Sequence, residues 1–383
     1  MKKDQLSRLA AIVCAISGAS AFASAEDIEL GVIGPFTGPV ATYGRDLSNG
    51  LVLAVDEINA SGGIGGRKIT LLMGDDRASP KEAASLTQSY VSNPKVLAMI
   101  GGVTSTATFG AVPVAQKGKL PFLITLASHP DLTKEGDYIF RNSITMEQEG
   151  PALGRLVTTC LGAKSIAMMY INNDLGVSMT KEFKKALAQD GVKVLAEESY
   201  DPGENIDYSA KLAKMKAANA DVIWFGSQSN DLALILKQAQ RVNLGDKPLL
   251  ASSNANAVGL TDVAGAAANN VYLHAPFTTA TPDPKVRAFT AKFEQKYKVT
   301  PGPVSAQAYE GMYILAQEIQ RGGFKRDGLQ KALLTMKPYQ GLGSMISFDP
   351  KTRETKGKVY TPLVVKDKQF LLWQDCQAKL AKK

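Results

Sequence analysis

The chain has 383 residues, of which 45% are hydrophobic and 21% charged, and these fractions are typical of folded soluble proteins. Its formal net charge is +8, but the lysines are scattered along amphipathic helical segments, so the charge does not predict a nucleic-acid partner. Only two histidines are present and no Gly-x-Ser-x-Gly elbow occurs, which argues against a histidine metal cage and an esterase-type nucleophile. We therefore expect no metal and no cofactor.

The N-terminus reads as a cleavable secretion signal. Positive charges precede an apolar stretch at 9–22, which ends on the small-x-small sequence Ala-Ser-Ala at 23–25. The apolar stretch is too short, and too interrupted by serine and glycine, for a membrane anchor. Cys14 does not predict a lipoprotein, because a bulky valine precedes it. The sequence predicts a signal peptide over 1–25 and a mature chain that begins at Glu26 in the periplasm.

Short β-branched runs alternate with amphipathic helical segments along most of the mature chain. Strands are expected at 28–34, 68–74, 96–101, 121–125, 165–171, 192–199, 221–226 and 248–252. Helices are expected at 50–60, 79–91, 179–190, 230–241, 284–298 and 304–321. Such alternation is typical of α/β folds with parallel sheets covered on both faces. The two series of four strands, separated at about 138–150, predict two doubly wound Rossmann-like lobes, and a strand-rich tail completes both.

Two cysteines remain in the mature chain, Cys160 and Cys376. In an oxidising compartment a disulfide between them would tie the C-terminal tail to the helix that ends at Cys160. Two free buried thiols are an open alternative.

In doubly wound sheets, ligands bind beyond the carboxyl ends of the strands. The loop after the first strand presents Tyr43 near a helix start, although a merely packed tyrosine fits as well. After the third strand, Ser105 and Thr106 begin a helix, and its free N–H groups with two hydroxyls predict a carboxylate site rather than simple capping. The loop after the fourth strand adds the carbonyl of Ala127 and the hydroxyl of Ser128.

The strand ends of the second half indicate binding rather than catalysis. The segments 172–176, 226–231 and 252–257 are rich in amides and lack a nucleophile beside a base. His129 precedes a proline and is interpreted as an ordinary loop side chain, not a general base. The glycine-rich stretch at 62–68 follows a helix and precedes a strand, which is the wrong order for a dinucleotide fingerprint.

The motifs GPFTGPVATYG, GLVLAVDEINASGGIGGRKI, IGGVTSTAT, ASHPDLT, YIFRNSITMEQEG and FDPKTRETKG occur in this order behind the signal. In this combination the chain resembles the periplasmic Leu/Ile/Val-binding family of ABC-importer solute receptors over essentially its whole mature length. The resemblance implies a type I periplasmic binding fold, with three crossovers between two lobes and the ligand trapped between them. Its bounds would be 26–143 and 276–346 for the first lobe, and 144–275 and 347–383 for the second.

Matching motifs carry the family's ligand contacts onto the first lobe. Tyr43 corresponds to the aromatic residue that lies on the ligand. Ser105 and Thr106 correspond to the carboxylate-binding segment, and Ala127 and Ser128 to the loop that holds the ligand's α-substituents.

The second lobe departs from the family pattern. Leu175 and Gln228 stand where aromatic residues are usual, and Ser253 stands where an acidic residue commonly meets the ligand's ammonium group. A buried ammonium without a charged partner costs several kcal/mol, unless Asp174 or Asp231 takes that role. Ala306, with Tyr309 close by, also replaces an aromatic residue near the helix after Pro303, which leaves room for a larger ligand.

We therefore expect a non-enzymatic, monomeric receptor that binds an amino acid or, as the more specific expectation, an aromatic or other organic acid. Its partner would be an inner-membrane ABC permease. A sensing module that feeds a chemoreceptor or kinase remains the alternative, and an extracytoplasmic hydrolase is the least favoured class.

Overall fold

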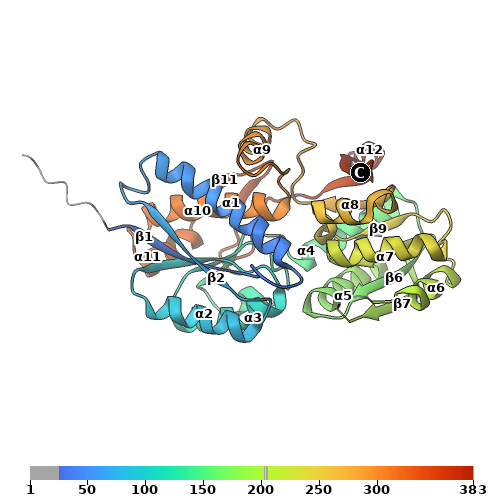
Figure 1. Cartoon of the computed structure of the whole chain (residues 1–383), viewed down its shortest axis with the longest axis horizontal. Helices are drawn as coiled ribbons and strands as arrows, with labels where there is room; N and C mark the ends of the chain where they lie inside the picture. Colours follow the sequence, from blue (N-terminus) through green and yellow to red (C-terminus); the bar gives the residue numbers. More distant parts are fainter. Residues whose placement is uncertain (1–25, 202, 204–205, 383) are drawn as a thin grey trace, which may run out of the picture.

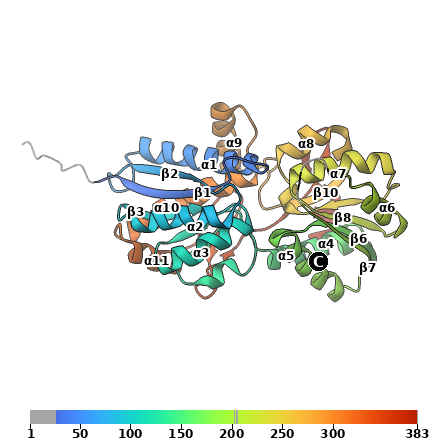
Figure 2. The ribbon, with the colours of Figure 1, turned by 60° about the horizontal axis from the view of Figure 1, so that its bottom comes forward.

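The computed structural model describes residues 26–201, 203 and 206–382. The expected signal peptide at 1–25 lies outside the described residues. The chain forms two α/β lobes that lie side by side, as the sequence predicted (Figure 1). Each lobe has a central sheet with helices on both faces (Figure 2).

The first lobe has a five-stranded parallel sheet in the order β2-β1-β3-β4-β5. Its strands are β1 (Ile28–Gly34), β2 (Ile69–Asp75), β3 (Val96–Gly101), β4 (Phe122–Ile124) and β5 (Ile139–Arg141). One face packs against α1 (Ala41–Ala60), α10 (Pro303–Arg321) and α11 (Arg326–Leu334). The other face packs against α2 (Pro80–Ser92) and α3 (Ser105–Lys117).

The second lobe has a seven-stranded sheet in the order β15-β14-β10-β9-β8-β6-β7. Its strands are β6 (Ser165–Ile171), β7 (Lys193–Tyr200), β8 (Val222–Gly226), β9 (Leu249–Ala251), β10 (Val271–Ala275), β14 (Thr361–Lys366) and β15 (Gln369–Leu372). The first five run parallel, and β14 and β15 join antiparallel at one edge.

Helices again cover both faces of this second sheet. The helices α6 (Ser209–Ala217), α7 (Ser229–Val242) and α8 (Val258–Ala264) pack on one face. The helices α4 (Met146–Arg155), α5 (Asp174–Gln189) and α12 (Gln374–Leu380) pack on the other, together with a π-helical turn at Leu156–Cys160. The first turn of α4 is fixed by a capping box between Thr145 and Gln148.

Cys160 and Cys376 form a disulfide. It joins the π-helical turn after α4 to α12, so the C-terminal tail is fastened to the second lobe. The Lys379 ammonium adds a hydrogen bond to the Cys160 carbonyl at 2.7 Å.

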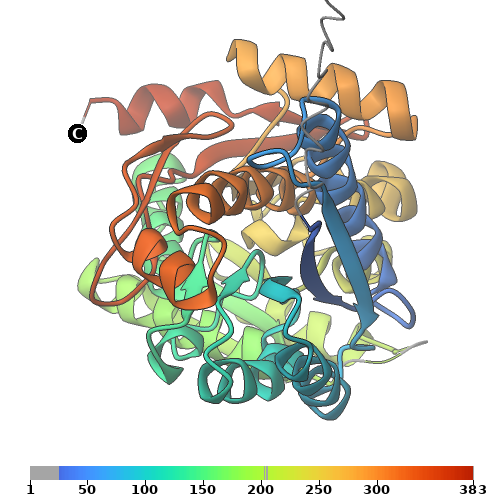
Figure 3. The same cartoon turned by 90° about the vertical axis from the view of Figure 1, so that its left-hand side faces the viewer.

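The chain passes between the lobes three times. It leaves the first lobe after β5, returns after β10 to build α9 (Pro284–Tyr297), α10 and α11, and leaves again before β14. Helix α9 stands out from the first lobe beside α1 (Figure 3).

A small antiparallel sheet of β11 (Tyr339–Gln340), β12 (Met345–Phe348) and β13 (Thr355–Lys356) precedes the last crossing. The expected boundary between 346 and 347 falls inside β12. The Phe348 ring lies 5.6 Å from that of Phe140 in the core of the first lobe. We therefore propose that the last crossing follows β13.

No helix in the described part of the chain combines the length and the apolar character that crossing a bilayer requires.

Candidate functional site

A cavity of about 300 Å³ lies between the two lobes, at the carboxyl ends of the parallel strands. We call it the ligand cavity. Its lining comprises Pro39, Val40, Tyr43, Ala78, Val103, Thr104, Ser105, Thr106, Leu126, Ala127, Ser128, Ile171, Asn173, Leu175, Gln228 and Asn254. None of these residues carries a charge, so the described wall combines apolar side chains with neutral hydrogen-bonding groups.

The N-terminus of α3 forms the polar end of this cavity. Gly101 and Gly102 have φ angles of +127° and +72°, which turn the chain sharply out of β3 into the helix. The Thr104 side chain caps the helix by accepting from the Ala107 N–H, which leaves the preceding N–H groups without helical partners. The Ser105 side chain is 3% exposed, and its Oγ has no hydrogen-bond partner. This end of the cavity can therefore accept an anion.

Thr106 has a different role from Ser105. Its hydroxyl donates to Asp174 Oδ2 at 2.7 Å, and Asp174 belongs to the first turn of α5 in the opposite lobe. The hydroxyl therefore bridges the two lobes instead of pointing freely into the cavity.

Buried Arg141, which the sequence analysis did not single out, shapes the loop after β4. Its Nη1 donates to the Ala127 carbonyl at 3.0 Å and its Nη2 to the His129 carbonyl at 2.8 Å. The Ala127 carbonyl therefore already has a donor, whereas Ser128 Oγ is buried without one. The His129 imidazole lies edge-on to Phe109 and accepts from the Asp131 N–H, as an ordinary loop side chain does.

Tyr43 crosses the cleft from the first turn of α1. Its hydroxyl donates to the Asn254 carbonyl at 3.0 Å and accepts from the Ser229 N–H at 3.1 Å, both in the second lobe. Burial raises the pKa of Tyr43, so it stays a neutral phenol. Tyr43 therefore forms part of the cavity wall and also links the lobes.

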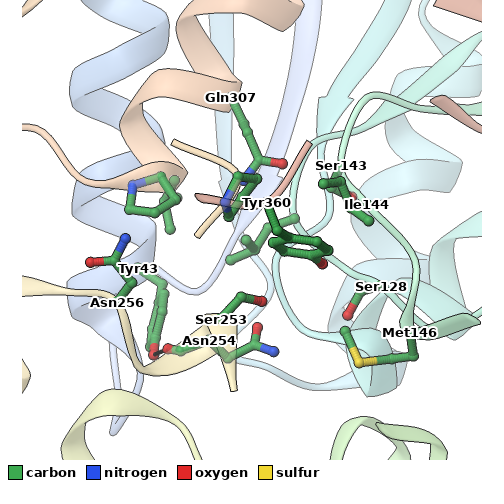
Figure 4. A pocket seen from close by; sticks show the side chains of 14 residues that line it. Tyr43, Ser128, Ser143, Ile144, Met146, Ser253, Asn254, Asn256, Gln307 and Tyr360 are labelled. Carbon is green, nitrogen blue, oxygen red and sulfur yellow. Dashed lines mark hydrogen bonds between the residues drawn. The ribbon is translucent and has the colours of Figure 1, made fainter. Parts of the chain in front are cut away.

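A second, smaller hollow of about 30 Å³ adjoins the ligand cavity near the crossovers, and we call it the hinge chamber (Figure 4). Its lining comprises Tyr43, Leu126, Ser128, Ser143, Ile144, Met146, Ser253, Asn254, Asn256, Pro276, Pro303, Val304, Gln307 and Tyr360. Four of these residues, Tyr43, Leu126, Ser128 and Asn254, also line the ligand cavity. The two spaces are therefore neighbours that share part of their walls.

Seven of the eight sequence-selected residues meet at the ligand cavity: Tyr43, Ser105, Thr106, Ala127, Ser128, Leu175 and Gln228. The eighth, Ser253, lines the hinge chamber instead. Ala306 is buried against Phe277 and Phe289 and lines neither space, because the face of α10 that carries Val304 and Gln307 points to the chamber. The idea that Ala306 enlarges the ligand cavity is therefore not supported by its position.

The acidic residue nearest to Ser253 is Glu149, which sequence reasoning missed. Glu149 is 1% exposed, and its Oε1 accepts from the Ser253 N–H at 2.8 Å and lies 3.0 Å from His274 Nε2. Burial alone would raise the pKa of Glu149, but the hydrogen bonds from His274 and Ser253 outweigh burial and lower it. The Tyr360 ring stacks on His274 at 4.0 Å. Glu149 therefore lines neither space, but it contacts the chamber wall through its hydrogen bond with Ser253.

Neither of the two aspartates considered as substitutes lines the ligand cavity. Asp174 bonds Thr106 and faces a charged outer rim with Lys134 and Lys181. The Asp231 carboxylate lies 3.4 Å from the Tyr200 hydroxyl within the second lobe, and burial raises its pKa.

A cleft between two doubly wound lobes joined by three crossovers defines the class of two-lobed ligand-binding proteins. A profile of the family described as "Periplasmic binding protein" matches residues 27–368. The chain therefore belongs to the periplasmic binding protein family, as the sequence analysis indicated.

Individual relatives agree with this membership. A leucine-, isoleucine-, valine-, threonine- and alanine-binding protein of Pseudomonas aeruginosa is 28% identical over 84% of this chain and 86% of its own length. The solved structure of LivJ from Streptococcus pneumoniae with isoleucine has a TM-score of 0.84 and 29% identity, and covers 90% of this chain and 97% of LivJ. A solute-binding protein of Rhodopseudomonas palustris in complex with benzoate shares the fold, with a TM-score of 0.83 and 20% identity. This match covers 91% of the present chain and 95% of the benzoate-bound protein.

Proposed function

We propose that this chain is the extracytoplasmic solute-binding receptor of an ABC importer of the branched-chain amino acid type. The observation that carries the proposal is the polar end of the ligand cavity, where the N-terminus of α3 and the unpartnered Ser105 hydroxyl face an otherwise uncharged space. These groups favour a carboxylate, because hydrogen bonds to a charged acceptor are worth about 1.5–3 kcal/mol each.

The uncharged wall of the ligand cavity also limits which charged groups the ligand can carry besides its carboxylate. An amino acid would bring an ammonium group into a space whose described lining has no carboxylate. Its burial without a charged partner costs several kcal/mol. We therefore favour an aromatic or other organic acid over a zwitterion, although the relatives in Pseudomonas aeruginosa and Streptococcus pneumoniae are associated with amino acids by their names. The likeness to the benzoate-bound protein adds only that this fold can enclose an aromatic carboxylate.

Capture of the ligand proceeds by closure of the lobes. Groups from both lobes line the ligand cavity, so the full set of contacts forms only in the closed arrangement. A micromolar dissociation constant corresponds to about 8 kcal/mol, which one carboxylate site and a buried apolar body together can supply.

Cleavage after residue 25 would release the receptor, as a monomer, into the periplasm, where the closed form would engage an inner-membrane permease. Family membership favours binding over catalysis. A sensing role with a chemoreceptor or kinase differs only in the partner, and co-purification with a permease and its ATPase would decide between them.

A matched ligand pair tests the choice between acid and amino acid. Leucine and 4-methylpentanoate have the same carboxylate and branched chain, but only leucine carries the ammonium group. We expect isothermal titration calorimetry to give a lower dissociation constant for 4-methylpentanoate or benzoate than for leucine. Strong binding of leucine without binding of either acid would contradict the proposed ligand class.

Replacing the free hydroxyl tests the carboxylate site. Ser105→Ala removes one hydrogen bond to the carboxylate, so the dissociation constant of whichever acid binds should rise about 10- to 100-fold. Ser89→Ala, on an exposed part of α2, is the matched control and should leave binding unchanged. Equal affinity of Ser105→Ala and the wild type would rule out this residue as a carboxylate ligand.

A further inference from the structure

The hinge chamber contains an unusual concentration of buried polar atoms without partners. Ser128 Oγ, Ser143 Oγ, Asn254 Nδ2 and Gln307 Oε1 all lie in residues that line it, and each lacks a hydrogen bond. Ser128, Ser143 and Gln307 are 4%, 2% and 2% exposed. Buried polar groups in folded proteins nearly always have a partner. The chamber therefore fits an occupant that satisfies these atoms.

The chemistry of the wall defines that occupant. The Asn254 amide donates, the Gln307 carbonyl accepts, and the two serine hydroxyls do either. No described residue in the lining is charged, so an ionised group would be buried there without a counterion. A volume of about 30 Å³ admits one small group. A hydroxyl, which both donates and accepts, meets all three conditions.

The chamber and the carboxylate site lie at different ends of the cleft. Of these two spaces, Ser105 and Thr106 line only the ligand cavity, whereas Ser143 and Gln307 line only the chamber. Ser128 and Asn254 line both. A ligand held by its carboxylate at α3 can therefore extend through the cavity and place its other end in the chamber.

We propose that the hinge chamber is a specificity subsite for a hydroxyl group that the ligand carries at the end away from its carboxylate. The inference rests on the proposed carboxylate-binding function and narrows its ligand class to hydroxylated organic acids. All three crossovers contribute to the chamber wall, through Ser143 after β5, Pro276 after β10 and Tyr360 before β14. A bound hydroxyl thus contacts the hinge segments themselves and favours the closed arrangement.

Matched acids with and without a hydroxyl test the subsite by isothermal titration calorimetry on the mature protein. The probes are benzoate against 3-hydroxybenzoate and 4-hydroxybenzoate, and hexanoate against 6-hydroxyhexanoate. We expect at least one hydroxylated acid to bind about tenfold or more tightly than its parent. If no hydroxylated acid gains affinity, the chamber holds only water and the subsite is refuted, while binding of the parent acids still supports the receptor function.

Two variants separate the subsite from the carboxylate site. We call the ratio of the dissociation constant of the parent acid to that of the hydroxylated acid the hydroxyl advantage. Ser143→Ala should reduce this ratio to less than threefold and leave binding of the parent acid unaffected. If the serine variant folds poorly, Gln307→Met, of similar shape, should give the same result. Ser105→Ala should weaken parent and hydroxylated acids by the same factor. A hydroxyl advantage that survives both chamber variants would overturn the inference. Failure of every acid to bind would overturn the proposed organic-acid ligand class and this inference together, and binding of leucine in the same titrations would still support the receptor role.

Discussion

The pKa values of two adjacent aspartates, Asp75 at the end of β2 and Asp76 directly after it, shift in opposite directions. Asp76 is fully buried, its Oδ2 has no partner, and burial raises its pKa to about 6. For Asp75 burial also acts to raise the pKa, but hydrogen bonds from Thr37 and from the N–H groups of Arg77 and Phe36 outweigh it and lower the pKa. The two carboxyls should therefore affect stability with opposite dependence on pH.

Asp76→Asn should stabilise the protein at pH 7.5. A carboxyl whose folded pKa is raised contributes stability below its unfolded pKa of about 3.8 and loses it as the pH rises through about 6. The gain on removing that charge is at most about 3 kcal/mol, from a shift of about two units. Urea unfolding at pH 4.5 and 7.5 measures it, and an Asp76→Asn protein less stable than wild type at pH 7.5 would contradict the expectation.

Asp75→Asn is the matched control for this pair. Because the folded pKa of Asp75 is lowered, its stabilising effect is present above the unfolded pKa and is lost as the pH falls through the folded pKa. The variant should therefore be less stable than wild type at pH 7.5, and the difference should shrink in acid.

Residues that line the ligand cavity could be predicted from the sequence where they follow a buried strand. Ser105, Ser128 and Gln228 follow buried strands directly, so the rule for ligand sites in doubly wound sheets was sufficient to find them. Gln307 and Tyr360 come from a helix and a crossover in the last quarter of the chain. Their position at the hinge depends on how the lobes pack, and no local sequence pattern encodes that packing.

At the scale of elements, α1 shows where propensity misleads. The sequence predicted this helix at 50–60 and placed Tyr43 in the preceding loop, near the start of a helix. The structure begins the helix at Ala41. A Cβ at Gly44 would lie 2.1 Å from the Pro35 carbonyl oxygen, and one at Gly50 would lie 2.2 Å from that of Ser305. Close tertiary packing therefore requires the residues that weaken the local helix signal.

The disulfide at the end of the chain should contribute substantially to stability. It closes a loop of 216 residues in sequence, and long loops lose the most conformational freedom in the unfolded state when they are cross-linked. The double variant Cys160→Ser with Cys376→Ser should lose about 2–5 kcal/mol in urea unfolding.

Reduction of the wild-type disulfide is the control for that variant. Neither cysteine lines the ligand cavity, so the dissociation constant for a bound acid should not change. Reduced wild type should unfold at the same urea concentration as the double serine variant. Unchanged stability in both would mean that α12 packing alone fixes the tail.

At the scale of the whole molecule, the alternation of strands and helices was enough to predict two lobes and their parallel sheets. The last crossing was harder to locate, since β11, β12 and β13 are two to four residues long and form a sheet of their own. Such short strands carry no periodicity, and it is tertiary contacts, such as that of Phe348 with Phe140, that place them against the first lobe.

Closure of the two lobes should depend on the hydrogen bond between Thr106 and Asp174. The bond exists only when α3 and α5 approach each other, so it favours the closed arrangement alone. Asp174→Ala should raise the dissociation constant of a bound acid about 3- to 10-fold, equivalent to about 1 kcal/mol, and increase the radius of gyration of the ligand-free protein in small-angle X-ray scattering. Thr106→Val should have the same effect, and the double variant no larger one, because both remove a single interaction. Glu182→Ala is the control, because it removes a charge from α5 and from the same outer rim as Asp174 without affecting the Thr106–Asp174 bond. It should leave both the dissociation constant and the radius of gyration unchanged. Additive effects of Asp174→Ala and Thr106→Val would show that the two residues do not act through a shared bond.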